Sequence, residues 1–262
     1  MDQIQTAKQL SSFTALLRGA WSLFSGRFKT LAAIILPPIA AMGALSLWVS
    51  FGISPWVYLA ALIAVSVLQL ISELALIKAI SVETGFSDAY KYALKNFFPY
   101  LWLIVLASVV IMGGLLLGFI PGVIFSVWFA LSVYILVVEN QKGMDALVRG
   151  REYVRGYWWN IFWKLTLASL LLSVLLSPLL WLLDKVGGAI AGLIVFALGY
   201  LAGAFLAVFI YRLYQDVISV KPEMAVAPVG GKRGWFIFAA ILGFLLAANV
   251  LWILLRTSLA AF

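Results

Sequence analysis

Long apolar runs separated by short polar segments dominate the chain, and their lengths predict transmembrane helices. A helix needs about 20 mainly apolar residues to cross a hydrocarbon core about 30 Å thick. The runs that reach or approach this length are residues 31–50, 56–80, 99–117, 123–138, 161–183, 189–211 and 235–255. The segments FGISP, GFIPG and DKVGG separate the first run from the second, the third from the fourth and the fifth from the sixth, and their Gly and Pro residues break the helices. The pattern therefore predicts three transmembrane hairpins and a solitary seventh span.

The composition supports a membrane protein and argues against an enzyme. Hydrophobic residues make up 65% of the 262 residues and charged residues only 11%, which is too little polar surface for a water-soluble core. The chain has no His and no Cys, so it lacks the commonest general base, the commonest metal ligand and any thiolate nucleophile. We therefore expect no catalytic residue, no metal site and no cofactor.

The Lys and Arg residues are distributed unevenly between the two sides of the predicted spans. If the N-terminus lies in the cytoplasm, all 18 of these residues except Lys185 and Arg256 fall on the cytoplasmic side. This asymmetry predicts a multi-pass protein of the cytoplasmic membrane with its N-terminus inside and its C-terminus outside. The net charge of +8 is interpreted as a surface for the anionic headgroups of the inner leaflet, and no nucleic-acid partner is expected.

A short amphipathic segment precedes each of the three hairpins. In GFSDAYKYAL, Phe86, Ala89 and Tyr90 begin a helical apolar face, and FTALLRGAWSLF has the same spacing. The third segment, MDALVRGREYV, is less regular because Arg151 is expected on the apolar side. We predict an all-α integral membrane protein with three parallel repeats, each an interfacial amphipathic helix followed by a transmembrane hairpin. The alternative is that amphipathic linkers between any two spans look alike.

This organisation predicts domain boundaries. The predicted repeats cover about residues 9–80, 84–138 and 143–214 of a six-span membrane domain, residues 1–214. A cytoplasmic linker, residues 215–234, and a C-terminal transmembrane helix, residues 235–262, are expected to follow.

Two segments resemble a known family. FTALLRGAWSLFSGRFKTLAAII and PGVIFSVWFALSVYILVVENQKGMDALVRGREYVRGYWWNIF look like the membrane domain attached to some bacterial glycerophosphodiester phosphodiesterases, which also occurs in stand-alone, uncharacterised bacterial membrane proteins. In that family a Pro-Gly pair opens a span, an acidic residue closes it and a basic amphipathic helix follows, and Pro121, Gly122, Glu139 and Arg149 match these features. The resemblance covers residues 9–214 and implies a six-span unit. It implies no phosphodiesterase activity, because the residues of the soluble enzyme domain are not found in this sequence.

Glu73 is the most unusual residue of the predicted spans. Its carboxylate is expected about 10 Å deep, where it must face protein or water. Ser66, Gln69 and Glu73 are spaced i, i+3, i+7 and form one polar stripe, the candidate intramembrane polar site. A proton or substrate site is one interpretation, and a buried polar contact that locks helices together is the other. Gly199 and Gly203 of the sixth span are expected to allow close helix packing.

Charged residues gather at the predicted cytoplasmic ends of the spans. Glu83 and Glu139 each follow a returning span, and we predict that they pair with Arg18 or Arg149; a solvated carboxylate is the alternative. Arg212 and Asp216, spaced i, i+4, complete this candidate interfacial charge network. The residues predicted to contact lipid headgroups are Arg18, Lys91, Lys95, Arg149, Arg151 and Arg155.

These features favour a non-enzymatic integral membrane protein that acts as a lipid-interacting or accessory scaffold of the cytoplasmic membrane. Its expected partners are membrane lipids, with anionic headgroups of the inner leaflet preferred, and the sequence leaves its protein partners unknown. The alternative is a transporter or permease-like protein for a small solute or lipid that uses a polar seam around Glu73.

Overall fold

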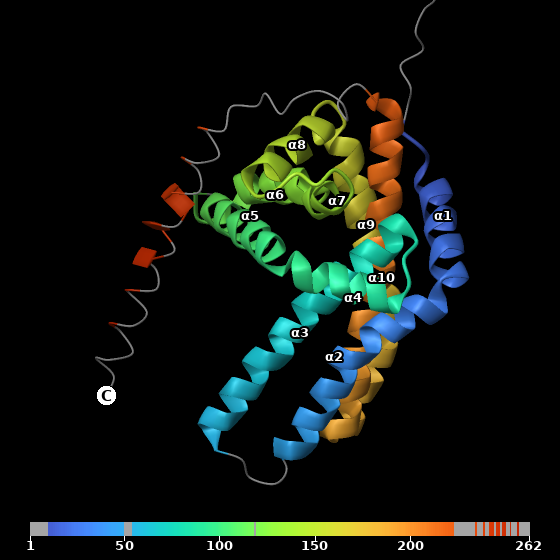
Figure 1. The fold of residues 1–262 in the computed structure, drawn as a ribbon, viewed down its shortest axis with the longest axis vertical. Coiled ribbons are helices and arrows are strands. Elements are labelled where there is room, and N and C mark those ends of the chain that lie inside the picture. Colours follow the sequence, from blue (N-terminus) through green and yellow to red (C-terminus); the bar gives the residue numbers. More distant parts are fainter. Residues whose placement is uncertain are drawn as a thin grey trace, which may run out of the picture. The chain divides into compact units, whose positions relative to one another are not determined.

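The computed structural model describes residues 10–49, 54–117 and 119–222, together with scattered positions between 234 and 256. Within these residues the protein is all-helical and contains no strand, as the sequence predicts. The helices are α1 (Phe13–Gly26), α2 (Phe28–Val49), α3 (Pro55–Val82), α4 (Phe86–Lys95), α5 (Phe97–Leu117), α6 (Phe119–Phe129), α7 (Ser132–Val138), α8 (Met144–Val154), α9 (Trp158–Val186) and α10 (Gly188–Val220) (Figure 1).

Six stretches of the described chain are long and apolar enough to cross a membrane. They are α2, α3, α5, the continuous stretch of α6 and α7, α9, and α10. Helix α10 continues to Val220, through the first residues of the predicted linker. The rest of that linker from residue 223, and most of the predicted seventh span, lie outside the described residues.

The chain divides into two compact units, which are described separately below. The first comprises Met1–Phe97 and Trp163–Asp216, and the second comprises Phe98–Phe162 and Val217–Phe262. The first unit therefore holds α1 to α4 with most of α9 and α10, and the second holds most of α5, all of α6 to α8 and the start of α9. Neither unit coincides with a predicted repeat, and the relation between the repeats stays a prediction.

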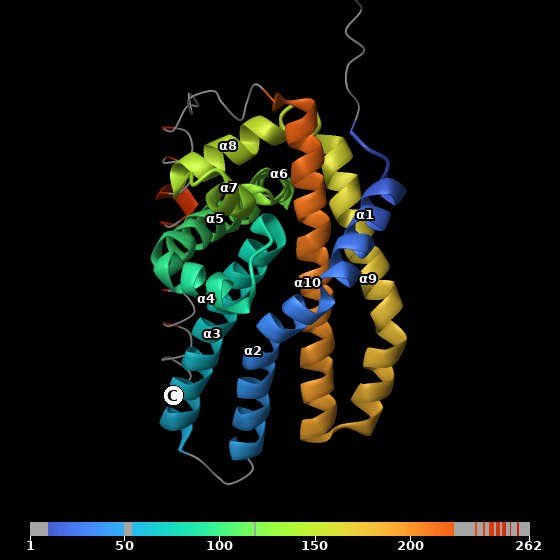
Figure 2. The same cartoon turned by 45° about the vertical axis from the view of Figure 1, so that its right-hand side comes forward.

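The first unit contains the α2–α3 and α9–α10 hairpins, and the short helix α1 lies beside α10 (Figure 2). Aromatic side chains join α1 to α10: the ring centroids of Phe13 and Phe209 are 5.7 Å apart, and those of Phe24 and Phe205 are 5.6 Å apart. The buried face of α1 consists of Leu16 together with Ala20 and Phe24. The apolar face of this amphipathic helix therefore packs against protein.

Helix α4 packs against α3 in the same unit. Ala89 and Ala93 are its buried residues, as the predicted apolar face requires. The hydroxyl of Tyr90 lies 2.7 Å from the hydroxyl of Ser72 on α3 and donates a hydrogen bond of 2.9 Å to the backbone carbonyl of Ile34 on α2. Because Ser72 is fully buried, this contact supplies its polar group with a partner. One tyrosine thus links three helices.

In the second unit, the fourth predicted span is divided into α6 and α7, with a turn at Ala130 and Leu131. The sequence predicts one continuous helix here, because neither residue is a Gly or Pro. Helix α8 packs against both halves. At Gly150 a Cβ atom would lie 2.6 Å from the backbone oxygen of Trp128 and 2.8 Å from the hydroxyl of Ser132, so only glycine allows this close approach. The approach occurs at the break in the span.

Candidate functional site

A buried charge cluster forms where α7 ends and α8 packs against it. The Nε atom of Arg149 lies 3.5 Å from Glu139 Oε2, and its Nη1 atom lies 3.9 Å from Glu152 Oε2. The hydroxyl of Tyr153 donates a hydrogen bond of 2.8 Å to Glu139 Oε1. Burial raises the pKa of Tyr153 above the ordinary tyrosine value, and the hydrogen bond to Glu139 raises it further. These contacts couple the end of α7 to α8.

Arg149 occupies the buried face of α8. Its side chain is only 2% exposed and shares that face with Ala146, Gly150 and Tyr153. Arg151, which the sequence places on the apolar side, is half-buried, and Arg149 lies deeper, beside the carboxylates of Glu139 and Glu152. The guanidinium of Arg149, a predicted headgroup residue, is therefore enclosed by protein.

Lys221, which follows α10, caps the C-terminal end of α8. Its ammonium group donates hydrogen bonds of 2.9 Å to the backbone carbonyls of Glu152 and Tyr153, and a third to the carbonyl of Arg155. Helix C-termini carry carbonyls without intrahelical partners, and a cation there is favourable. Burial lowers the pKa of Lys221, as does the charge of Arg155, whereas Glu152 raises it. Local sequence patterns do not reveal the role of this lysine, because the contact joins segments that are distant in the chain.

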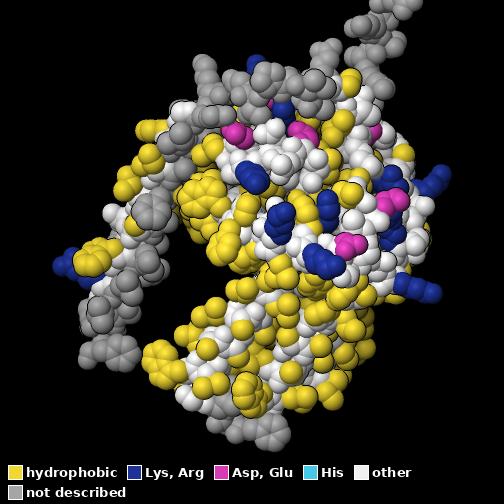
Figure 3. Space-filling view, in the orientation of Figure 1, with side chains coloured by type: hydrophobic (Ala, Val, Ile, Leu, Met, Phe, Trp, Pro, Cys, Tyr) yellow, Lys and Arg dark blue, Asp and Glu magenta, His cyan; other side chains and the backbone are white. Residues whose placement is uncertain are grey.

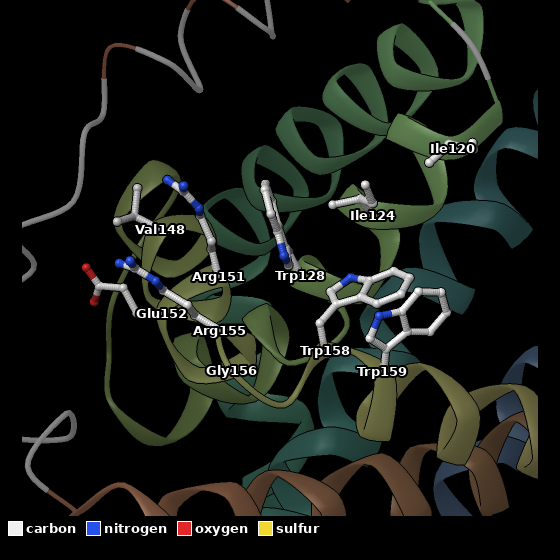
Figure 4. Close-up of a pocket in the computed structure, with 10 residues that line it drawn as sticks. All are labelled: Ile120, Ile124, Trp128, Val148, Arg151, Glu152, Arg155, Gly156, Trp158 and Trp159. Atoms are coloured by element: carbon white, nitrogen blue, oxygen red, sulfur yellow. The ribbon is translucent and has the colours of Figure 1, made fainter.

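An arginine-tryptophan cavity of about 910 Å³ opens beside this cluster (Figure 4). It is built from α6, α8, the turn after α8 and the start of α9. Gly156 follows the end of α8 with φ of 87°, a conformation that favours glycine and allows the chain to turn toward α9. The lining residues are Ile120, Ile124, Trp128, Val148, Arg151, Glu152, Arg155, Gly156, Trp158 and Trp159.

The charged and aromatic groups of the arginine-tryptophan cavity lie next to each other. The guanidinium carbon of Arg151 is 5.0 Å from the ring centroid of Trp128, which is a cation-π distance. The rings of Trp158 and Trp159 meet edge to face, with centroids 4.7 Å apart. Arg155 is exposed and Arg151 half-buried. Of the two predicted headgroup residues that line this cavity, Arg151 therefore adjoins an indole ring, and Arg155 shares the cavity with Trp158 and Trp159.

The other predicted headgroup residues, Arg18 on α1 and Lys91 and Lys95 on α4, are all exposed. We call these three the basic collar. Lys91 lies 3.6 Å from Asp88, one helical turn away. Figure 3 shows Lys and Arg side chains gathered over α4 and near α1, whereas hydrophobic side chains cover much of the visible surface over α2 and α3.

Glu83 pairs with Arg27, a residue that the sequence analysis did not single out. Arg27 lies between α1 and α2, and it also donates a hydrogen bond of 2.8 Å to the backbone carbonyl of Ala79 on α3. Glu83 is the residue that ends α3 and has a positive φ of 57°. Its side chain is 77% exposed, so the pair is worth little energetically. The predicted partner Arg18 lies farther back along α1.

Asp216 near the end of α10 holds the segment that enters α1. It accepts hydrogen bonds from the backbone N–H of Ser11 at 2.8 Å and from its hydroxyl at 2.6 Å, and lies 4.0 Å from the ammonium of Lys164. Arg212 donates a hydrogen bond of 3.1 Å to Gln215. The predicted network residues therefore fall into separate groups around Glu83, Glu139 and Asp216.

The polar stripe of α3 faces a second cavity, of about 620 Å³, in the first unit. Ser66, Gln69 and Glu73 line it, opposite α10 residues that include Gly199 and Gly203. A Cβ atom at either glycine would meet no atom within 4 Å, so the expected close packing at these glycines is not found among the described residues. We call this space the Glu73 cavity.

The fold and these sites define a multi-pass, all-helical membrane protein. The chain is similar to a UPF0259 membrane protein of Photorhabdus laumondii, with 30% identity over 172 residues. The match covers 60% of this chain and 62% of that relative, so it spans less than two thirds of the relative's length. No family model matches the chain, and no solved structure does. The resemblance to the membrane domain of glycerophosphodiester phosphodiesterases stays a prediction.

Proposed function

We propose that the protein is a non-enzymatic component of the cytoplasmic membrane that binds anionic phospholipids in the arginine-tryptophan cavity. The observation that carries the proposal is the placement of Arg151 and Arg155 beside three indole rings in one cavity. The absence of His and Cys from the sequence supports a role without catalysis. An N-terminus in the cytoplasm would put Arg151 and Arg155 of this cavity on the inner side, where anionic lipids carry a negative surface potential.

The chemistry of the cavity matches the two parts of a phospholipid. Guanidinium groups bind phosphate oxygens through paired, charge-assisted hydrogen bonds. Indole rings prefer the boundary between headgroups and acyl chains, because one end is apolar and the other donates a hydrogen bond. Ile120 and Ile124 continue the wall with aliphatic surface. A phosphate at the arginines would therefore leave an acyl chain beside the isoleucines and the indoles of Trp158 and Trp159.

The basic collar would supply a weaker and less specific attraction. Each Lys or Arg near an anionic membrane surface contributes about 1 kcal/mol, and this attraction falls off within a Debye length. Arg18, Lys91 and Lys95 are exposed and suited to that role. We do not expect Arg149 to bind headgroups, because its guanidinium is buried beside Glu139 and Glu152.

The test measures lipid binding by the full chain, purified in non-ionic detergent and stripped of lipid. Phosphatidylglycerol and phosphatidylcholine with the same acyl chains are added, and the melting temperature and the lipids retained in native mass spectrometry are recorded. Phosphatidylglycerol is expected to stabilise the protein, since a ligand at a hundred times its dissociation constant adds about 2.7 kcal/mol. Glycerol phosphate alone should stabilise it much less, because it lacks the acyl chain.

Substitutions distinguish lipid binding in the arginine-tryptophan cavity from lipid binding at the basic collar. Arg151→Gln with Arg155→Gln should abolish most of the stabilisation by phosphatidylglycerol, whereas Lys91→Gln with Lys95→Gln should retain the tightly held lipid. Lys185→Gln, which changes an exposed lysine at the other end of α9, should behave as the unmodified protein. An unchanged response to phosphatidylglycerol in the doubly substituted arginine variant would refute the proposal.

The Glu73 cavity favours a second candidate function, a transporter or permease-like protein. Its support is that the whole predicted polar stripe of α3 lines one space at the depth of the spans. Under this hypothesis Glu73→Gln would abolish solute flux in liposomes. Unchanged flux with reduced thermal stability would instead indicate a structural role for Glu73.

A further inference from the structure

The Glu73 cavity has the size and the charge of a site for a small organic ligand. Its volume of about 620 Å³ falls within the range of about 300 to 1,000 Å³ that is usual for such pockets. Glu73 is the one charged side chain among the described residues that line it, and its side chain is exposed. A carboxylate about 14 Å along α3 from the end of that helix gives the cavity a net negative charge at membrane depth.

Two aromatic rings on α10 add a second feature that suits a cation. Phe196 and Tyr200 both line the Glu73 cavity, and their ring centroids are 5.8 Å apart. The hydroxyl of Tyr200 donates a hydrogen bond of 3.1 Å to the backbone carbonyl of Gln69, which holds this ring against α3. Aromatic faces attract cations, and the attraction is stronger when the cation is desolvated.

The rest of the wall is apolar or small. Leu70 and Leu76 from α3 and Ala204 and Ala207 from α10 contribute no formal charge. An inorganic divalent cation would require several oxygen ligands, and one carboxylate does not supply them. An anion would meet Glu73. We propose that this cavity binds a monovalent organic cation with a large apolar body, its charge near Glu73 and the aromatic rings, and its body against the aliphatic wall.

This site is independent of lipid binding at the arginine-tryptophan cavity, and it requires binding but no transport. Tetraphenylphosphonium, a monovalent cation with an apolar body, is a suitable probe. Its binding to the full chain in zwitterionic nanodiscs is measured by flow dialysis, with empty nanodiscs of the same lipid as the blank. The expected result is saturable binding with one site per chain.

Matched variants locate the bound cation. Glu73→Gln is expected to weaken binding at least tenfold, and Gly203→Leu should block it by filling space that the structure leaves open at this glycine. Asp184→Asn removes an exposed carboxylate near the end of α9 and should leave binding unchanged. Arg151→Gln with Arg155→Gln should also leave it unchanged, which separates this site from the lipid site.

Two results would overturn the proposal. One is the absence of saturable binding by the unmodified protein, and the other is equal affinity in the unmodified protein and in Glu73→Gln. Size-exclusion profiles and melting temperatures of each variant show whether it is folded. If Glu73→Gln does not fold, Gly203→Leu tests the site, because it retains the carboxylate and changes only the space in the cavity. Unchanged binding in Gly203→Leu would then refute the proposal.

Discussion

Replacement of Gly150 by alanine tests whether α8 packs against the break between α6 and α7. The new Cβ would lie 2.6 Å from the backbone oxygen of Trp128 and 2.8 Å from the hydroxyl of Ser132. The first of these atoms belongs to the helix backbone, so it has little freedom to move aside. Overpacking of this kind costs about 1–3 kcal/mol, while alanine gains about 1 kcal/mol over glycine in a helix. Because both contacts are short, we expect a net loss of about 2 kcal/mol.

The matched control is Gly192→Ala, which makes the same substitution within α10 at a position with no neighbouring atom within 4 Å. It should be neutral or should stabilise the protein by up to about 1 kcal/mol through helix propensity alone. Melting temperatures in detergent provide the measurement, since 1 kcal/mol corresponds to a shift of about 2–4 °C in a chain of this size. The packing argument fails if Gly150→Ala raises the melting temperature as much as Gly192→Ala does.

Three further predictions concern polar contacts. Arg149→Met should cost about 3 kcal/mol of stability. This is the lower end for a broken buried ion pair, because the guanidinium lies 3.5 Å from Glu139 and 3.9 Å from Glu152. A double-mutant cycle with Glu139→Gln, followed by melting experiments, should show strong coupling between the two residues. Tyr90→Phe should cost about 1–3 kcal/mol, because it removes the side-chain hydrogen-bond partner of the buried Ser72 hydroxyl. Ser72→Ala in that background should cost little more. Because the pKa of Tyr153 is raised in the folded state, its contribution to stability is fully present below the unfolded pKa of about 10 and is lost at higher pH. The melting temperature of Tyr153→Phe should therefore fall less steeply above that pH.

The sequence alone predicts the apolar helices well, because the length of an apolar run and its Gly and Pro boundaries are local properties. The six stretches that can span a membrane match the first six predicted runs in order. The short helices α1, α4 and α8 also lie where amphipathic spacing places them. The polar stripe of Ser66, Gln69 and Glu73 was found from helical periodicity and does face one cavity.

The contacts that build the sites depend on segments far apart in the chain, and local patterns do not predict them. The ion pair of Glu83 with Arg27 and the capping of α8 by Lys221 both join distant segments. The burial of Arg149 depends on two carboxylates that only the packing of α8 brings together. No Gly or Pro marks the division between α6 and α7, and it lies between Trp128 and Ser132, the two residues whose atoms a Cβ at Gly150 would meet.

The amphipathic helices raise a more general question, because lipid tails and buried protein provide the same apolar environment. Periodicity therefore cannot tell which of the two an apolar helix face will meet. Here α1 packs against α10, α4 against α3, and α8 against α6 and α7. Because protein occupies these faces, we expect the exposed cations of the basic collar to act mainly through screened, long-range attraction to an anionic membrane. In the arginine-tryptophan cavity, by contrast, exposed apolar and charged groups lie together, as Trp159 and Arg155 do. Selection among anionic lipids should therefore depend on this cavity, and added salt should weaken the effect of the collar more than that of the cavity.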